Sequence, residues 1–303
     1  DSAAGDGQQE RRGNSRLPAP GEEFEAGAEE QVVNMPLPRL IEILPVKGPL
    51  KAEVSIPGSK SMTNRALILA AQAQGFTTIH GGLWSDDTEA MVNCLVKLGI
   101  PVEMFLDEAN PSNRHFRVTG WGGKIPTREA DLCVGNAGTT ARFITAFCTQ
   151  SEGRYRIYGS PRMHERPMDQ LFSILSSWGV VFEFQEQAGH LPVLITVPKQ
   201  LKIPPSVTVD LSRSSQFASA LELIRRRSGF TIQTEGFDDD GYYQLTRAMA
   251  CKPAAEMQIE PDASSATYFW AAASLVPGSD LRIKNWPAMS LQLDSKFAET
   301  VKD

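Results

Sequence analysis

The chain has 303 residues, with 30 Lys and Arg against 36 Asp and Glu, which gives a formal net charge of −6. Hydrophobic residues make up 41% and charged residues 22%, a composition typical of globular proteins and unlike that of disordered ones. The acidic total argues against a dedicated nucleic-acid binder, and the longest apolar run, Ala66 to Ala71, is far shorter than the ~20 residues of a membrane span. We expect a soluble protein with no nucleic-acid or membrane partner and, at ~150 residues per domain, two domains.

Residues 1–36 differ in composition from the rest of the chain. They are rich in Gly, Ala, Glu and Pro, and they contain eight acids, three arginines and a single aromatic, Phe24. Such a segment buries too little apolar surface to offset the entropy of ordering it, so we predict a disordered acidic tail over 1–36. The tail has neither the apolar core of a secretory signal nor the acid-poor composition of a transit peptide. The four cysteines form no CxxC pair and are predicted to be buried free thiols. Together these features predict a cytoplasmic protein.

A repeated unit follows the tail. Each copy begins with small polar residues that lead into an apolar helix, then a glycine and a β-branched strand, then a second helix and a second strand. First helices are predicted at 57–74, 135–152, 212–228 and 261–277, and the strands after them at 75–81, 153–159, 229–236 and 278–285. Second helices are predicted at 85–99, 166–179, 241–251 and 291–303, and second strands at 100–105, 180–184 and 255–260.

The glycines that follow the first helices give the period of the repeat. Gly75, Gly153, Gly229 and Gly278 are separated by 78, 76 and 49 residues. The two nearly equal spacings indicate duplication of an α/β unit in which helices cover one face of a sheet. The fourth copy stops inside its second helix, before the Leu-Gly or Trp-Gly that ends this helix in copies one and two. We therefore expect a chain that is truncated at its C-terminus.

The openings of the four first helices are alike. They read Ser59-Lys60-Ser61, Asn136-Ala137-Gly138-Thr139, Ser212-Arg213-Ser214-Ser215 and Asp262-Ala263-Ser264-Ser265. These residues are typical N-caps, but the N–H groups and the dipole of a helix N-terminus also bind anions. Cations accompany the openings: Lys60, Arg65, Arg142, Arg162, Arg166 and Arg213. The combination favours a small ligand that carries several negative charges.

Six motifs carry a resemblance to a known family. They are PGSKSMTNRALILAA, GNAGTTAR, PRMHERPM, SRSSQFASAL, GYYQLT and PDASSATYFWAAA. In this order, from about Ile41 onward, they resemble the enolpyruvyl transferases, in the branch that acts on shikimate 3-phosphate. The resemblance implies an α/β (α+β) inside-out barrel fold of two lobes, each built from three βαβαββ units. On this chain, 58–260 would form a complete lobe, and 37–57 with 261–303 would form one unit of a partial second lobe.

The resemblance also implies an activity. The family transfers the enolpyruvyl group of phosphoenolpyruvate to the 5-hydroxyl of shikimate 3-phosphate and releases phosphate, a step of the shikimate pathway to aromatic amino acids. It implies a monomer that needs no metal or organic cofactor. Matching motif positions assign shikimate 3-phosphate binding to Lys60, Ser61, Arg65, Ser214, Ser215, Gln216 and Tyr242. They assign phosphoenolpyruvate binding to Lys60, Asn136, Gly138, Arg162 and Gln216. Lys60 is the catalytic candidate, and Asp262 would lie where the lobes cross, in either a capping or a catalytic role.

The chain departs from the family pattern in three ways. Phe143 stands where a proline is common after GNAGTxxR, and Asp239 replaces a serine that often precedes the tyrosine motif. The family's aspartate base, with its cluster of Glu, Arg and Lys, has no counterpart in these residues. We therefore expect about half of the site and no activity of this polypeptide alone. The alternative is a non-catalytic anion-binding or interaction module built on the same fold.

Overall fold

The computed structural model describes residues 40, 42, 44–236, 241–251 and 254–301. The chain divides by its contacts into residues 1–46 and 47–303, and every helix and strand described lies in the second part. The predicted acidic tail at 1–36 and the substitution at Asp239 lie outside the described residues. Within the described residues, no helix combines the length and apolar character that a membrane crossing requires.

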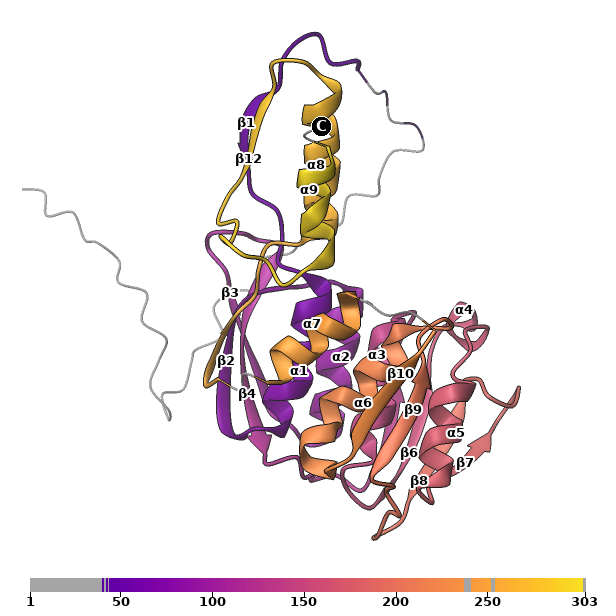
Figure 1. Ribbon diagram of the computed structural model, residues 1–303. Helices are drawn as coiled ribbons and strands as arrows, with labels where there is room; N and C mark the ends of the chain where they lie inside the picture. The colour runs from indigo at the N-terminus through magenta and orange to yellow at the C-terminus, as the bar shows by residue number, and fades with distance from the viewer. Residues whose placement is uncertain (1–39, 41, 43, 237–240, 252–253, 302–303) are drawn as a thin grey trace, which may run out of the picture. The chain divides into compact units, whose positions relative to one another are not determined.

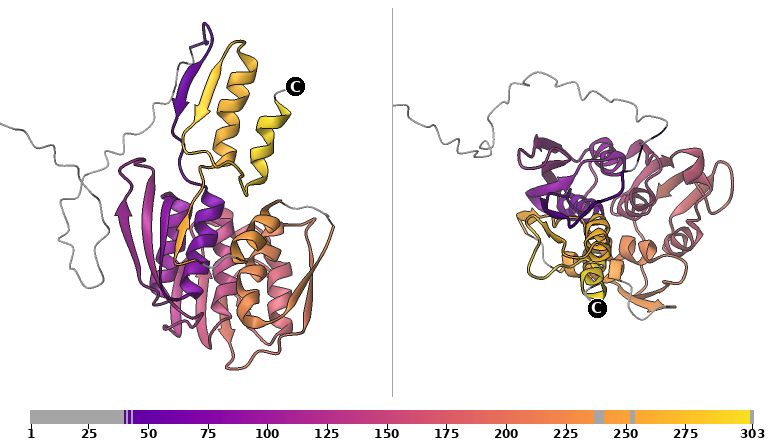
Figure 2. Two further views of the ribbon diagram at one scale, coloured as in Figure 1. Left: turned by 60° about the vertical axis from the view of Figure 1, so that its left-hand side comes forward. Right: turned by 90° about the horizontal axis from the view of Figure 1, so that it is seen from above.

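Three helices form the centre of the fold, and the sheets lie outside them (Figures 1 and 2). These are α1 (Lys60–Gln72), α3 (Gly138–Cys148) and α6 (Ser215–Ser228). Nine of the 13 residues of α1 and ten of the 11 residues of α3 are buried, so these helices are enclosed on nearly all sides. Their many small and apolar side chains suit that position, because such side chains allow helices to pack closely. The helices α2 (Asp86–Lys97), α5 (Asp169–Ser177) and α7 (Gly241–Ala250) bury one side each.

Two four-stranded sheets share one topology. The first has the order β11-β2-β4-β3 and the second the order β5-β6-β8-β7, each with one parallel pair followed by two antiparallel pairs. A third sheet pairs β9 with β10 in parallel. The bounds are β2 Gln74–Leu83, β3 Val102–Leu106, β4 Asn113–Trp121, β5 Glu129–Cys133, β6 Gly153–Tyr158, β7 Val181–Phe184, β8 Val193–Val197, β9 Ser206–Asp210, β10 Thr231–Glu235 and β11 Glu256–Gln258. The recurrence of one strand order confirms the predicted class of repeated α/β units.

Two strands pair far from their neighbours in sequence. β1 (Lys51–Val54) precedes α1 but pairs in parallel with β12 (Asp280–Ile283), beside α8 (Ala263–Leu275). Conversely, β11 precedes α8 but pairs in parallel with β2. The chain therefore crosses twice between these sheets, at 55–59 and at 259–262, and a bridge between Gly58 and Pro261 joins the two crossings.

The predicted elements are found at their expected places, with three corrections. The last helix, predicted over 291–303, is a 3-10 turn η1 (Leu293–Lys296) followed by α9 (Phe297–Thr300). Pro167 was expected in the first turn of the helix predicted over 166–179, but α5 begins only after Met168. Before it lies a separate short helix, α4 (Pro161–His164), which carries Arg162. The cysteines were all expected to be buried, yet Cys133 and Cys251 are exposed because they lie on an outward strand position and after a helix end.

Candidate active site

Lys60 lies in the first turn of α1, at a helix start that carries no acidic residue. The hydroxyl of Ser59 caps this helix by accepting a hydrogen bond from the N–H of Met62. The side chain of Lys60 is 49% exposed, and its Nζ lies 2.9 Å from Oδ2 of Asp87 in the first turn of α2. The hydroxyl of Thr140, at the start of α3, donates to the carbonyl of Asp87 at 3.0 Å. Asp87 therefore connects the starts of three helices.

Arg65 is buried one turn further along α1, with only 2% of its surface exposed. Its guanidinium donates to the Thr246 hydroxyl at 2.7 Å, to the Ser61 carbonyl at 2.8 Å and to the Tyr242 carbonyl at 3.1 Å. The Thr246 hydroxyl also donates to the Ser219 hydroxyl at 2.8 Å, so α1, α6 and α7 meet in one polar network. The residue expected to bind shikimate 3-phosphate thus also ties three helices together.

Phe143, the departure from the family's proline, packs against this network. Its ring is 1% exposed, and the guanidinium of Arg65 lies over it at 5.3 Å from the centroid. A cation above an aromatic face is stabilised by the ring quadrupole, more so where water is excluded. Phe143 therefore supports Arg65 from α3.

The start of α3 has no side-chain cap. Its N-cap is Ala137, and Asn136, expected there as a ligand, is exposed; its side chain contacts only the Ser160 hydroxyl among the described residues. The guanidinium of Arg166 packs directly on Gly138 and donates to the Asn136 carbonyl, so a Cβ at Gly138 would displace it. An uncapped N-terminus leaves N–H groups available to an anion.

Arg142 stands behind this helix start and is 4% exposed. Its guanidinium donates to the carbonyls of Gly138 and Pro167, while its Nε has no partner among the described residues. Burial, with a smaller contribution from nearby Arg166, lowers the pKa of Arg142 to about 10. Two cations held this close favour an anion between or beside them.

The start of α6 carries three of the expected ligands. The hydroxyl of Ser214 caps the helix by accepting from the Gln216 N–H at 3.2 Å, while Ser215 and the Gln216 side chain are half-buried. The neighbouring Arg213, expected to face an anion, instead forms a two-pronged ion pair with Asp169 at the start of α5, at 2.6 and 3.2 Å. That carboxylate satisfies the cation because the loop before α6 lies beside α5.

The starts of α7 and α8 complete the set. Tyr242, in the first turn of α7, is 42% exposed, and Asp262 caps α8 by accepting from the N–H and hydroxyl of Ser265. Both line a small pocket with Ser61 and with Leu293 of η1. Asp262 therefore caps α8.

Arg162 lies in α4, whose N-cap Ser160 contacts the segment before α3: the N–H of Ser160 donates to the Gly135 carbonyl at 2.7 Å, and its hydroxyl donates to Oδ1 of Asn136. The side chain of Arg162 is exposed and makes no hydrogen bond or ion pair within the part of the chain that the structure describes. The other expected residues lie at the starts of α1, α3, α6 and α7. Contacts made by Asp87, Arg65 and Arg142 connect these helices.

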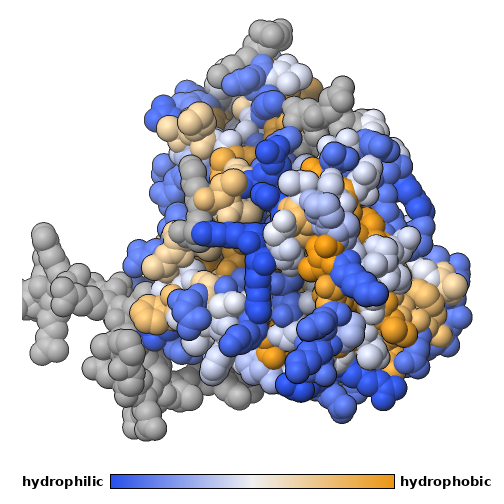
Figure 3. All heavy atoms as spheres, turned by 60° about the horizontal axis from the view of Figure 1, so that its bottom comes forward, coloured by the Kyte–Doolittle hydropathy of each residue, from blue (hydrophilic) through white to orange (hydrophobic). Residues whose placement is uncertain are grey.

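A larger cavity lies at the opposite ends of the central helices, at the end of the molecule that Figure 3 shows. It has a volume of about 450 Å³ and is lined by apolar side chains, among them Leu69, Leu223 and Met257, with Arg226 and Arg227 at its edge. The last carbonyls of α1 and α6 carry negative partial charge there, which disfavours anions. The helix starts therefore suit an anion better than these helix ends do.

Comparison with known proteins decides the family. The family model described as EPSP synthase (3-phosphoshikimate 1-carboxyvinyltransferase) matches residues 45–249 and 226–303. The chain is 38% identical over 278 residues to the 3-phosphoshikimate 1-carboxyvinyltransferase of Trichormus variabilis, and 36% identical over 285 residues to that of Ralstonia pickettii. The chain belongs to the EPSP synthase family.

The match to other members of the EPSP synthase family covers part of their length. It takes in 84% of this chain and 63% of the Trichormus protein, so the chain spans less than two thirds of that relative. The solved EPSP synthase of Acinetobacter baumannii superposes with a TM-score of 0.65 at 22% identity, over 82% of this chain and 58% of that one. This likeness supports the mixed helix and strand fold that the chain shares with EPSP synthases.

Sequence reasoning missed two groups of residues at this candidate site. Asp87 was read only as part of a helix, because acids are common in a first helical turn. Thr246 and Ser219, the hydroxyl partners of Arg65, lie inside helices with no local signal of their role. For the hydroxyl pair, no local pattern could have found them, since only helix packing brings them to Arg65.

Proposed function

We propose that the chain binds shikimate 3-phosphate and phosphoenolpyruvate at the joined helix starts and takes part in enolpyruvyl transfer between them, as a cytoplasmic monomer. The observation that carries the proposal is the start of α3, which no described side chain caps, beside Arg142, whose buried guanidinium has a lowered pKa and an Nε with no partner among the described residues. Charge of this kind is costly to bury unless an anion offsets it.

The reaction places several negative charges in one site. The 5-hydroxyl of shikimate 3-phosphate loses its proton as its oxygen bonds to C2 of phosphoenolpyruvate, and a proton adds to the C3 methylene of phosphoenolpyruvate. The resulting ketal then loses inorganic phosphate and a C3 proton, which restores the double bond. Two phosphates and two carboxylates must lie close together throughout, so fixed cations and N–H groups stabilise every stage.

The described residues divide this work. The N–H groups of α3 and Arg142, Arg162 and Arg166 suit the phosphate of phosphoenolpyruvate, while Ser61, Ser214, Ser215, Gln216 and Tyr242 suit shikimate 3-phosphate. Lys60 suits a position between them, since Asp87 already holds its ammonium beside the start of α3. Its charge can stabilise the departing phosphate once the contact with Asp87 opens.

Calorimetric titration of the chain tests this assignment. We expect shikimate 3-phosphate to bind alone and phosphoenolpyruvate to bind in its presence. Arg162→Ala should weaken phosphoenolpyruvate binding about tenfold to 100-fold, since a charge-assisted hydrogen bond contributes about 1.5–3 kcal/mol. Arg128→Ala is the matched control, because that arginine is 73% exposed and pairs with Glu152 away from the site.

An assay of phosphate release with both substrates present distinguishes a catalytic chain from a non-catalytic anion-binding module. Release in proportion to protein concentration supports the complete reaction. Binding without release supports the alternative, an anion-binding module on the same fold. Failure to bind either substrate refutes the site, as does equal weakening by Arg162→Ala and Arg128→Ala.

A further inference from the structure

The two chain crossings lead directly into helices of the site. The N–H of Ser59 donates to the Glu260 carbonyl at 2.8 Å, and the N–H of Asp262 donates to the Pro57 carbonyl at 2.9 Å. The first crossing ends at Gly58, and α1 begins at Lys60, two residues later. A shift of Gly58 therefore moves Lys60 and the helix start with it.

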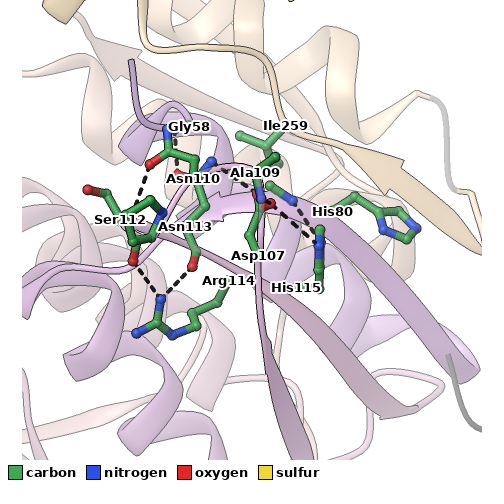
Figure 4. Close-up of polar contacts among 12 residues, drawn as sticks. Gly58, His80, Asp107, Ala109, Asn110, Ser112, Asn113, Arg114, His115 and Ile259 are labelled. Atoms are coloured by element: carbon green, nitrogen blue, oxygen red, sulfur yellow. Dashed lines mark hydrogen bonds and ion pairs between the residues drawn. The ribbon is translucent and has the colours of Figure 1, made fainter. Parts of the chain in front are cut away.

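Two side-chain amides hold the first crossing, one from the loop between β3 and β4 and one from the first residue of β4 (Figure 4). Oδ1 of Asn113 accepts the N–H of Gly58 at 2.8 Å, and Nδ2 of Asn110 donates to the Ile56 carbonyl at 3.0 Å. Asn113 is 7% exposed, so its bond to Gly58 is shielded from water. These amides satisfy backbone groups that a crossing segment cannot pair within a sheet.

The amide of Asn113 is itself fixed by Asp107. Nδ2 of Asn113 donates to Oδ2 of Asp107 at 3.4 Å, and the other carboxylate oxygen accepts the N–H of Ala109 at 3.0 Å. Oδ1 of Asn110 accepts the N–H of Ser112 at 3.1 Å. These contacts therefore hold both amides in one orientation.

Gly58 is confined on its other side by the backbone of β2. A Cβ at Gly58 would lie 2.0 Å from the Gly81 carbonyl oxygen, so only glycine fits there. The N–H of Gly81 in turn donates to Nδ1 of His115 at 3.2 Å, which holds this part of β2 in place. A cavity of about 350 Å³ lies beside the crossing, between Ser55, Gln258 and Lys284, and offers room for the segment to move if the amide bond is lost.

We propose that Asn113, assisted by Asn110, is a positioning residue for the substrate site: it fixes the start of α1 and with it Lys60 and Ser61. The role rests on the proposed function, because it matters through binding of shikimate 3-phosphate. Asn113 touches no substrate and acts only through Gly58.

Calorimetry and NMR on the whole chain test the role. Asn113→Ala leaves the N–H of Gly58 without its acceptor and should weaken shikimate 3-phosphate binding about tenfold, the equivalent of one lost hydrogen bond. It should also shift the amide resonances of Ser59 to Ser61 in the absence of ligand. Ser112→Ala is the control, since its exposed hydroxyl makes no hydrogen bond within the described residues.

A charge-preserving exchange supplies the rescue. Asn113→Asp alone sets two carboxylates against each other and should weaken binding as Asn113→Ala does. Combined with Asp107→Asn, the new carboxylate at 113 still accepts from Gly58, and the new amide at 107 donates to it. Binding within about threefold of the unmodified chain is expected for this pair.

Each outcome bears on the role. Unchanged affinity and unchanged α1 resonances in folded Asn113→Ala overturn it, as does a paired exchange that fails to restore binding. If Asn113→Ala does not fold, Asn110→Ala and the exchange decide by the same readouts. Absence of shikimate 3-phosphate binding by the unmodified chain overturns the proposed function itself, and the ligand-free resonances distinguish that failure from failure of the amide contact.

Discussion

Replacing Arg65 by alanine probes the polar network that joins the three helices α1, α6 and α7. The change removes donors to the carbonyls of Ser61 and Tyr242 and to the hydroxyls of Thr246 and Ser219, all at a position with 2% exposure. A hydrogen bond to a charged group contributes about 1.5–3 kcal/mol, but bonds within one network do not add. Several buried polar groups would be left without their donor and the truncated side chain would leave a cavity, so we expect a loss of about 3–5 kcal/mol in unfolding free energy. For a protein of this size the melting temperature should fall by roughly 10 °C.

Urea unfolding followed by tryptophan fluorescence measures this loss. Trp178 is fully buried against Phe230 and reports on the core. Arg65→Lys should lose less unfolding free energy than Arg65→Ala, because lysine keeps the charge and part of the side chain. It should still lose some, because one ammonium cannot reproduce the planar fork of the guanidinium. Arg128→Ala, at an exposed ion pair, should change stability by less than about 1 kcal/mol.

Two results would refute the reasoning about Arg65. One is an Arg65→Ala variant whose unfolding free energy lies within about 1 kcal/mol of that of the unmodified chain, with the same slope against urea concentration. The network would then contribute no more than an exposed ion pair does. The other is an Arg65→Lys variant as stable as the unmodified chain, because geometry of the fork would then be irrelevant.

Three further predictions concern charge at the helix starts. Asp87→Asn removes the ion-pair partner of Lys60 and a nearby negative charge, so phosphoenolpyruvate should bind a few-fold tighter at low salt, measured by calorimetry. The unfolding free energy should be almost unchanged. Weaker binding would contradict the idea that Asp87 competes with phosphoenolpyruvate for Lys60. Arg213 lowers the pKa of Asp169, so the stability from this pair is present above the ordinary carboxyl pKa of ~4 and is lost as pH falls through the lowered value. Arg213→Ala should raise the pKa of Asp169, which a carbon-13 NMR titration measures. An unchanged pKa of Asp169 would argue against the ion pair. Burial lowers the pKa of Arg142 to about 10, so its charge is lost as pH rises through 10; bound phosphoenolpyruvate should raise that pKa, seen in the guanidinium NMR signals, and no change on binding would place the anion elsewhere.

Much of the secondary structure could be predicted because its signals are local. Hydroxylated or acidic residues cap α1, α6 and α8 through Ser59, Ser214 and Asp262, as their types suggest. Glycine ends α6 in the left-handed conformation at Gly229, where φ is +76°. Each of these features depends on a few neighbouring residues, so the sequence alone is enough to locate it.

The partners of the site residues could not be predicted, because they come from other elements. Lys60 was expected to face a ligand, and only the packing of α1 against α2 shows that Asp87 holds it. Arg213 carried the same expectation, and the neighbouring α5 supplies Asp169 as its partner instead. An ion pair depends on distances between elements, which residue type and spacing do not give.

By itself, the sequence determined the repeated units, their helix starts and the supply of cations for an anionic ligand. Only the tertiary structure decided that β1 pairs with β12 and β11 with β2, so that the chain crosses twice and each crossing enters a helix. A strand's own residues set its faces, but its partner is chosen by which edges the rest of the fold leaves open. For the same reason Asn113 could not be assigned from its own segment: its acceptor role exists only where Gly58 passes over β2.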